Sequence, residues 1–424
     1  MKKLSCVVSC PISTYSGYGA RSRDFVKGLI QAYPDLDVKI LSQRWGNTRL
    51  SFLQDTNDTF FTPLIIPNLT VKPDIWIQIT VPNEFRRIGT LNIGVTAGIE
   101  TTHCHHSWIE GINNMDLTLT SSEHSKNVLE QTVYEHKQDN NSSLIRTTKP
   151  IQVLFEGVDT SIYKVVDLKD NTLDLSEINE KFCFLTVGHW MQGKLGHDRK
   201  NIGYTVKAFL EAFKDKDKQP ALILKTLQAT SSIIDKKNII EKINLIKDTV
   251  KGKLPNIYLL HGDMSDEEVN LLYNNPKVKC MVSLTKGEGY GRPLAEFASI
   301  GKPVIASNWS GHLDFLKKEL VFLVNGTLEN VDESAQVKDM ILKESKWFKP
   351  DDIEVIETLK TVFKEYNNHT GRARQQSSFM LQNFSYNKMV ELLKTLLDPF
   401  VDKIPKHVEL QLPKLNLPKL QKIE

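Results

Sequence analysis

The sequence has few cysteines, no long apolar run and little net charge, and each shortage narrows the class of protein. Its 424 residues contain five cysteines, an odd and small number that does not suit a framework of disulfide bonds. No apolar run approaches the ~18 residues of a membrane-spanning helix. A formal net charge of +3 argues against a strongly basic surface for nucleic acid or membrane. These features predict a folded, reduced, cytoplasmic protein.

Short apolar runs alternate with helical patterns along the chain, which predicts βα units and parallel sheets. The first residues, MKKLSCVVSC, follow this pattern. Their apolar part is only about seven residues and is interrupted by serine, so it is interpreted as a strand and not as a signal peptide. A polar, charged stretch at 165–181 predicts a linker between two series of strands. The predicted strands are 4–9, 38–41, 74–79, 91–96, 117–120 and 151–154, then 182–187, 221–225, 257–260, 280–283, 304–306 and 320–323.

Two features mark the C-terminal end of the sequence. The helical pattern NKMVELLKTLLDPF, residues 387–400, is expected to stop at Pro399. Beyond it, LPKL occurs twice between Leu412 and Leu420. The spacing of its prolines excludes a helix and predicts an extended strip on a surface. A docking or nucleic-acid role for its lysines stays open.

The stretch LTKGEGYGRPLAEFASIGKPV, residues 284–304, places three glycines around a glutamate. A dinucleotide fingerprint needs the spacing G-x-G-x-x-G, whereas Gly287, Gly289 and Gly291 are spaced G-x-G-x-G. Glu288 would lie unfavourably against a bare pyrophosphate unless it faced a neutral group that carries hydroxyls. The spacing and the charge therefore favour a sugar over a dinucleotide.

A short helix is predicted at 294–300, because Pro293 suits a first helical position and Gly301 suits a stop. The amino end of a helix carries about half a positive charge and binds phosphate without a metal. Glu296, eight residues after Glu288, is expected in the first turn, where its two oxygens suit the hydroxyls of a ribose. The pattern predicts a sugar-nucleotide site; the alternative is an ordinary βα turn in which Glu296 only favours the start of the helix.

The segment GEGYGRPLAEFASIGKPVIAS resembles the E-x7-E motif of retaining glycosyltransferases of the group 1, family 4 type, which have the GT-B fold. Other segments resemble the same family in the same order along the chain. They are SGYGARSRDFVKGL (16–29), SSEHSKNVL (121–129), FEGVDTSIY (155–163), TVGHWMQGKLGHDRKNI (186–202) and IYLLHGDMSDEEVNLLY (257–273). The resemblance implies an α/β protein in which two Rossmann-like parallel-sheet domains face each other across a cleft.

The resemblance also implies a division of the chain. Residues 1–165 would form an N-terminal acceptor-binding domain and 166–181 the linker. Residues 182–385 would form the C-terminal domain that binds the nucleotide sugar. A helix at 386–400 could pack back on the N-terminal domain, and 401–424 would be an extended tail rich in proline, lysine and leucine.

The family pattern assigns donor contacts to the glycine-loop motif. Glu288 would contact hydroxyls of the donor sugar, and Glu296 would hold the ribose. The backbone N–H groups of Gly289, Tyr290 and Gly291 would approach the sugar and the diphosphate. Glu288 is thus the first residue implied in catalysis.

Further contacts to the diphosphate are implied elsewhere in the chain. Lys200 matches a diphosphate-binding lysine of the family and is implied in catalysis. His189 stands where the family has an arginine, which puts one phosphate contact in doubt, and Arg199 or Arg292 could replace it. The amides of the loop from Gly17 to Gly19, where a tyrosine separates the usual glycine pair, are a third source of positive charge.

The implied reaction is transfer of a hexosyl group from a nucleoside diphosphate sugar, most closely one like UDP-glucose, with retention of configuration. No metal or other cofactor is implied. The D-x-D patterns at 35–37 and 215–217 have charged, helix-flanking surroundings and are interpreted as solvated surface. The alternatives are a sugar-nucleotide 2-epimerase of the same fold and a non-catalytic sugar-nucleotide-binding protein.

The acceptor side centres on the sequence HCHH at 103–106. Adjacent ligands on one loop do not easily surround one metal ion in tetrahedral geometry. The loop follows a predicted strand whose carboxyl end should face a crevice, so it is expected to line the acceptor cleft. Glu100, His103 and His106 are the acceptor-side candidates, and Glu100 is the third residue implied in catalysis.

The acceptor itself has two alternatives, a glycan and a hydroxymethylated pyrimidine in DNA. The segments TAGIETTHCHHSWIEG and NWSGHLDFL look most like phage-encoded members of the family, which would act in the host cytoplasm. DNA as acceptor needs a basic rim and an extruded base. Arg86, Arg87, Arg372, Arg374 and the lysines of the tail could contribute to such a rim.

Overall fold

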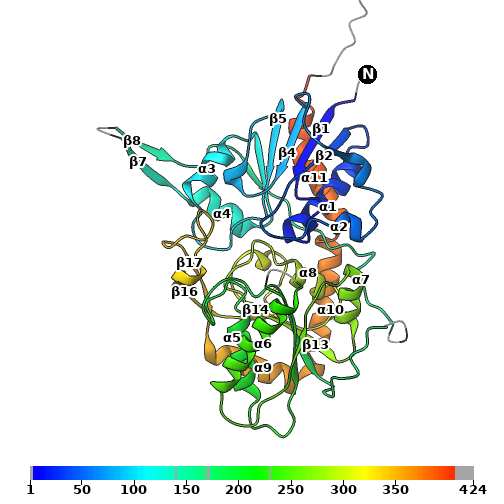
Figure 1. The fold of residues 1–424 in the computed structure, drawn as a ribbon, viewed down its shortest axis with the longest axis vertical. Coiled ribbons are helices and arrows are strands. Elements are labelled where there is room, and N and C mark those ends of the chain that lie inside the picture. The colour runs from blue at the N-terminus through cyan, green and yellow to red at the C-terminus, as the bar shows by residue number, and fades with distance from the viewer. Residues whose placement is uncertain (1–2, 139–140, 168, 170–171, 229–230, 406–424) are drawn as a thin grey trace, which may run out of the picture.

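The computed structural model describes residues 3–405, except 139–140, 168, 170–171 and 229–230 (Figure 1). The repeated LPKL segment therefore lies outside the described residues. Two bodies, each built around a parallel sheet, lie one above the other in Figure 1, with the N-terminal half in blue and cyan. Among the described helices, none is both long and apolar enough to cross a membrane.

The first sheet has seven strands in the order β3-β2-β1-β4-β5-β6-β9, and all its neighbouring strands run parallel. Every residue of β4 and β5 is buried, as expected for strands covered by helices on both faces. The six predicted strands of the first series are confirmed; β3 was missed because it has only two residues. The strands are β1 (Ser5–Cys10), β2 (Asp37–Ser42), β3 (Ile65–Ile66), β4 (Ile75–Ile79), β5 (Leu91–Val95), β6 (Leu117–Thr120) and β9 (Ile151–Val153).

The second sheet has six parallel strands in the order β12-β11-β10-β13-β14-β15. All six correspond to the strands predicted for the second series. Two Rossmann-like domains in tandem are therefore confirmed. The strands are β10 (Cys183–Val187), β11 (Ala221–Lys225), β12 (Ile257–Leu260), β13 (Val278–Ser283), β14 (Val304–Ser307) and β15 (Phe322–Val324).

Helices connect the strands of both sheets. Those of the first domain are α1 (Gly17–Ala32), α2 (Phe52–Asp55), α3 (His106–Asn113) and α4 (Glu123–Gln131), with the 3-10 turns η1 (Thr62–Leu64) and η2 (Pro82–Glu84). Those of the second domain are α5 (Ile202–Phe213), α6 (Ile233–Asp248), α7 (Asp266–Asn274), α8 (Arg292–Ala298) and α9 (Asp352–Lys364), with η4 (Gly311–Asp314) and η5 (Glu333–Ala335).

Two antiparallel hairpins interrupt the βα pattern, and the sequence patterns did not predict them. The strands β7 (Tyr134–Gln138) and β8 (Asn141–Ile145) form an arm that projects from the first domain (Figure 1). The strands β16 (Gly326–Asn330) and β17 (Lys346–Pro350) form the second hairpin, which lies in the second domain on the side that faces the first.

Two C-terminal helices, α10 (Tyr366–Asn383) and α11 (Tyr386–Val401), lead the chain from the second domain back to the first. Helix α11 packs against α1, and the Tyr33 hydroxyl donates to Asp398 at 2.7 Å. The expectation that this helix stops at Pro399 was wrong, because α11 runs through the proline to Val401. Proline lacks an N–H donor and crowds the preceding turn, but only two residues of α11 follow Pro399, so the helix ends soon after it.

We expect the α1–α11 contact to be a main source of stability. Leu393 is fully buried on α11, so Leu393→Ala should lower the free energy of unfolding by about 2 to 4 kcal/mol. Leu381→Ala is the matched control, because Leu381 is 42% exposed on α10 and should lose less than about 0.5 kcal/mol. Urea unfolding followed by circular dichroism measures both. Equal losses in the two variants would contradict this packing.

Candidate functional site

Loops from the carboxyl ends of the two sheets meet between the domains. The loop after β5 lies against the glycine loop that follows β13, and the Ser121 hydroxyl, just after β6, donates to the carbonyl of Gly289 at 3.1 Å. In α/β sheets, ligands bind outside the carboxyl ends of the strands. The glycine loop is therefore placed where such a site is expected.

The three glycines of this loop are required for different reasons. A Cβ on Gly287 would collide with the carbonyl of Glu100, and one on Gly289 with the carbonyl of Ala97. Gly291 caps α8 with φ 98° and ψ 51°, a left-handed conformation that glycine adopts without steric cost. Close approach of the first domain thus accounts for two glycines, and the turn into α8 for the third.

Glu288 lies at the centre of this loop and is only 5% exposed. The Lys200 ammonium donates to both of its carboxylate oxygens, at 2.6 and 2.8 Å. The Arg199 guanidinium lies 3.5 Å from Glu288 and 3.3 Å from Glu100. Burial by itself would raise the pKa of Glu288, but Lys200 and then Arg199 outweigh it and lower the pKa to about 2. The carboxylate is therefore ionised, and it already forms ion pairs with Lys200 and Arg199.

Glu296 lies on α8 and is 6% exposed. It was expected in the first turn, but α8 begins at Arg292, so Glu296 is its fifth residue. This position places it four residues after Arg292, whose Nε donates to it at 2.9 Å. Burial raises the pKa of Glu296 to about 7, and Arg292 opposes the rise. Arg292 also pairs with Asp24 of α1 at 2.5 Å, so this charge group connects the two domains.

Cationic groups gather at the carboxyl ends of the central strands of the second sheet. His189 follows β10, and Lys225 ends β11. Burial of the His189 ring, together with the nearby charges of Lys200, Lys225 and Arg199, lowers its pKa to about 4. His189 therefore stays neutral near pH 7, and the positive charge of this edge comes from the lysines and the arginine.

The glycines at the start of α1 differ in what they offer. The N–H of Gly19 donates to the Ser16 hydroxyl at 3.0 Å, which caps the helix. A Cβ on Gly19 would collide with Thr14, whereas one on Gly17 would meet no atom within 4 Å. Of the two glycines, Gly17 therefore has open space beside it. The amide of Gly19 already donates its hydrogen bond to Ser16.

The acceptor-side candidates divide into two groups. Glu100 lies beside the donor loop through its ion pair with Arg199. His103 and His106 are exposed, and their ring nitrogens contact Thr102 at 3.0 Å and Glu110 at 3.1 Å. The structure therefore places Glu100 with Lys200 and Glu288 and leaves the two histidines on the surface.

The second hairpin contacts both loops of the site, and sequence reasoning missed it. The backbones of Thr102 and Lys346 join at 3.0 Å, and the Lys346 N–H donates to the Thr102 hydroxyl at 2.9 Å. The Phe348 N–H donates to the carbonyl of Lys286 at 2.9 Å. Local sequence patterns carry no signal for these contacts, because they join residues more than 60 positions apart.

Two sequence patterns had suggested metal sites. The aspartates of the D-x-D patterns lie on the surface, and neighbouring residues of the HCHH sequence differ in burial. Asp35, Asp37, Asp215 and Asp217 are exposed, and Cys104 is buried away from the exposed His103. Within the described part of the chain, no group of three or more histidine, cysteine, aspartate or glutamate side chains is arranged to hold a metal ion.

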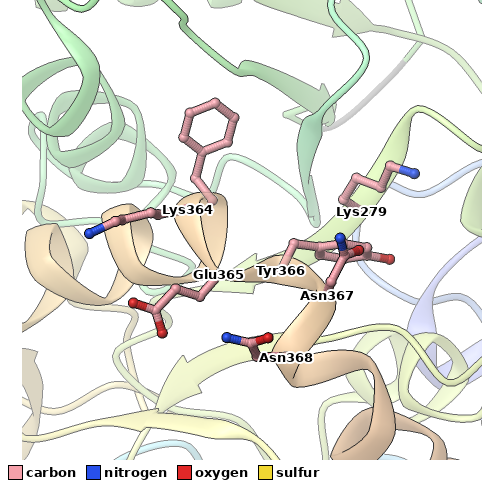
Figure 2. A pocket seen from close by; sticks show the side chains of 7 residues that line it. Lys279, Lys364, Glu365, Tyr366, Asn367 and Asn368 are labelled. Atoms are coloured by element: carbon pink, nitrogen blue, oxygen red, sulfur yellow. The ribbon is translucent and has the colours of Figure 1, made fainter.

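A cavity of about 460 Å³ opens where α9 meets α10 (Figure 2). Its lining consists of Lys279, Phe363 and residues 364–368. Figure 2 shows side chains that come mainly from the helix junction. None of the residues that surround Glu288 lines it, so this cavity is separate from the candidate site.

Comparison with protein families identifies the second domain. Residues 202–346 match the family described as "Glycosyl transferases group 1". The chain carries a group 1 glycosyltransferase domain. The matched segment contains both Glu288 and Glu296, and Lys200 lies two residues before it. A search of curated protein sequences finds no significant match.

Solved structures with a similar fold include several glycosyltransferases. HepE of Anabaena, in complex with UDP and glucose, has 11% identity and a TM-score of 0.60, over 93% of this chain and 100% of that chain. Sucrose-phosphate synthase of Thermosynechococcus elongatus has 10% identity and a TM-score of 0.60, over 94% and 100%. A glycosyltransferase of Rickettsia africae has 13% identity and a TM-score of 0.61, over 95% and 100%. The two-domain arrangement is the GT-B fold.

The buried ion pair of Glu288 and Lys200 gives a pH-dependent prediction. The pKa of Glu288, about 2 in the folded protein, lies below its unfolded value near 4.3. The pair therefore stabilises the fold above about pH 4.3, and this stabilisation is lost as the pH falls toward 2. Lys200→Gln should lower the free energy of unfolding by about 2 kcal/mol at pH 7, with nearly the same loss at pH 4 and a much smaller loss at pH 2.

Urea unfolding at pH 2, 4 and 7 measures this effect. The control is Lys360→Gln, because Lys360 pairs with Glu357 on the surface at 2.9 Å. An exposed pair contributes at most about 1 kcal/mol, so the control should change stability little at any of the three pH values. A loss from Lys200→Gln that stays constant from pH 7 to pH 2 would contradict the pairing.

Proposed function

We propose that this protein is a retaining glycosyltransferase that moves a hexosyl group from a nucleoside diphosphate sugar to a hydroxyl of an acceptor. The observation that carries the proposal is Glu288, a buried, ionised carboxylate on the glycine loop of the group 1 domain, held by Lys200 and Arg199. A carboxylate with two acceptor oxygens suits vicinal sugar hydroxyls. The cations beside it suit a diphosphate.

The donor we propose is a uridine diphosphate sugar such as UDP-glucose. HepE, whose fold is similar, was solved with UDP and glucose, which supports this choice. In the proposed complex Lys200 and Arg199 transfer from Glu288 to the diphosphate. Glu288 is then free to accept hydrogen bonds from the sugar hydroxyls. Binding of the diphosphate and recognition of the sugar are thus coupled through one carboxylate.

In the proposed reaction the bond between C1 of the sugar and the phosphate oxygen breaks, and its electron pair leaves with the nucleoside diphosphate. The acceptor hydroxyl forms the new bond to C1 on the same face, and its proton passes to the leaving phosphate oxygen. Lys200 stabilises the charge that develops on this phosphate, a kind of contact whose removal commonly costs about 3 kcal/mol of barrier. Glu100 lies next to this site through Arg199 and would orient the acceptor hydroxyl. We propose that no metal takes part, because the cations of the chain supply this charge.

The acceptor we propose is a glycan or another small hydroxyl compound. Arg87 pairs with Asp116 at 2.9 Å, just before β6 and so at the amino end of the first sheet. Arg372 lies 3.7 Å from the centre of the Phe322 ring on the second domain, and Arg374 packs beside Gly301. These arginines do not surround Glu288. They therefore do not form a basic rim that would hold DNA at the site.

Substitutions of the two glutamates test the donor site. Glu288→Ala should reduce transfer about 100-fold or more, because the sugar loses its orienting carboxylate, with little change in UDP affinity. Glu296→Ala should instead weaken UDP binding. Glu267→Ala on the exposed face of α7 is the control and should change neither. Product formation by mass spectrometry and UDP binding by calorimetry are the measurements. Transfer at the normal rate in both site variants would contradict the assignment.

Products identified by mass spectrometry decide the acceptor and the class of reaction. The wild-type protein is offered UDP-glucose with a glycan or with hydroxymethylated DNA. We expect UDP release and a mass gain of one hexose only with the glycan. A hexose on the DNA base would overturn the proposed acceptor. Conversion of UDP-glucose to its C2 epimer without any acceptor would favour the 2-epimerase, and donor binding without any conversion would favour a non-catalytic binding protein.

A further inference from the structure

Ser310, in the loop after β14, holds the backbone of Glu288. The N–H of Glu288 donates to the Ser310 hydroxyl at 2.9 Å. The N–H of the next residue, Gly311, donates to the carbonyl of Glu288 at 2.9 Å. Two consecutive residues therefore bind both backbone groups of Glu288. Ser310 is 4% exposed, so its hydroxyl is not shared with bulk water.

The backbone of Ser310 is strained. Its φ of 80° and ψ of −163° lie in a region that is essentially restricted to glycine. A protein with serine in this conformation has a lower free energy of unfolding, on account of the strain, than one with glycine there. The neighbouring Gly311 is closely packed, because a Cβ there would collide with the carbonyl of Gly289. The hydroxyl to Glu288 is the contact that serine makes here and glycine would not.

The other end of the same loop is fixed as well. The Ser307 hydroxyl donates to the carbonyl of Thr285 at 2.7 Å. The buried ring of His312 lies with Nε2 at 2.6 Å from the carbonyl of Ser307. The segment 307–312 is therefore attached to the donor loop both before and at Glu288, and Ser310 provides the side-chain contact to the Glu288 backbone.

We infer that Ser310 is a positioning residue that sets the direction of the Glu288 carboxylate at the donor site. This inference rests on the proposed function. Glu288 must exchange Lys200 for sugar hydroxyls, and the direction of its short side chain follows from the orientation of its backbone. A loop that tilts at Glu288 would misplace the carboxylate, and small misplacements of orienting groups reduce rates strongly. The hydrogen bond from the Glu288 N–H to the Ser310 hydroxyl opposes this tilt.

Two substitutions separate strain from positioning. Both Ser310→Gly and Ser310→Ala remove the hydroxyl, but only glycine relieves the strained φ. Ser310→Gly should therefore melt at a higher temperature than Ser310→Ala while it lowers kcat about tenfold. Ser310→Ala keeps the strain and removes the hydroxyl, so it should lower both the melting temperature and kcat. Asn57→Gly is the matched control, because Asn57 also has a positive φ, of 49°, in an exposed turn. It should raise the melting temperature and leave kcat unchanged.

Binding measurements complete the test. Calorimetry with UDP and with UDP-glucose should show that Ser310→Gly leaves UDP affinity unchanged and removes the additional affinity contributed by the sugar. A purely structural role for Ser310 would change neither kcat nor this difference. Ser310→Gly with wild-type kcat, or with a melting temperature below that of Ser310→Ala, would overturn the inference. A wild-type protein that neither binds nor turns over any sugar nucleotide would overturn the proposed function, and the inference with it, so the two failures are distinguishable.

Discussion

The buried ion pair between Glu288 and Lys200 is the interaction on which the rest of the site depends. A carboxylate that is 5% exposed is strongly destabilising unless a cation and further hydrogen bonds accompany it. The chain meets this requirement from two directions. Lys200 and Arg199 approach from the loop before α5, and Ser310 and Gly311 hold the backbone from the loop after β14. The loops that follow β10, β13 and β14 are therefore fixed relative to one another by their contacts to one residue, Glu288.

The same charges connect the two domains. Arg199 bridges Glu288 to Glu100 of the first domain, and Arg292 bridges Glu296 to Asp24. Each arginine thus has one carboxylate partner in its own domain and one in the other. A ligand that takes over either arginine changes the contact between the domains. Binding at the glycine loop and the relative position of the domains are therefore linked through the same ion pairs.

Much of the fold could be predicted from the sequence, because buried parallel strands are continuous apolar runs bounded by turns. Twelve such runs corresponded to strands. The glycine loop with Glu288 was visible for the same reason, since its glycines and charges are contiguous. The length of the last helix and the turn that contains Glu296 were missed by a few residues, because caps and prolines near helix ends tolerate more than one boundary.

By itself, the sequence determined the two α/β domains and the loop that carries Glu288, since both follow from local patterns of apolar residues and glycine. Tertiary structure alone decided which charges meet there. Glu288 lies 88 positions from Lys200 and 22 from Ser310, and His103 and His106 lie outside the site although they are close to Glu100 in sequence. Burial makes these distant partners necessary, because a carboxylate removed from water must find its cation and its donors wherever the fold brings them.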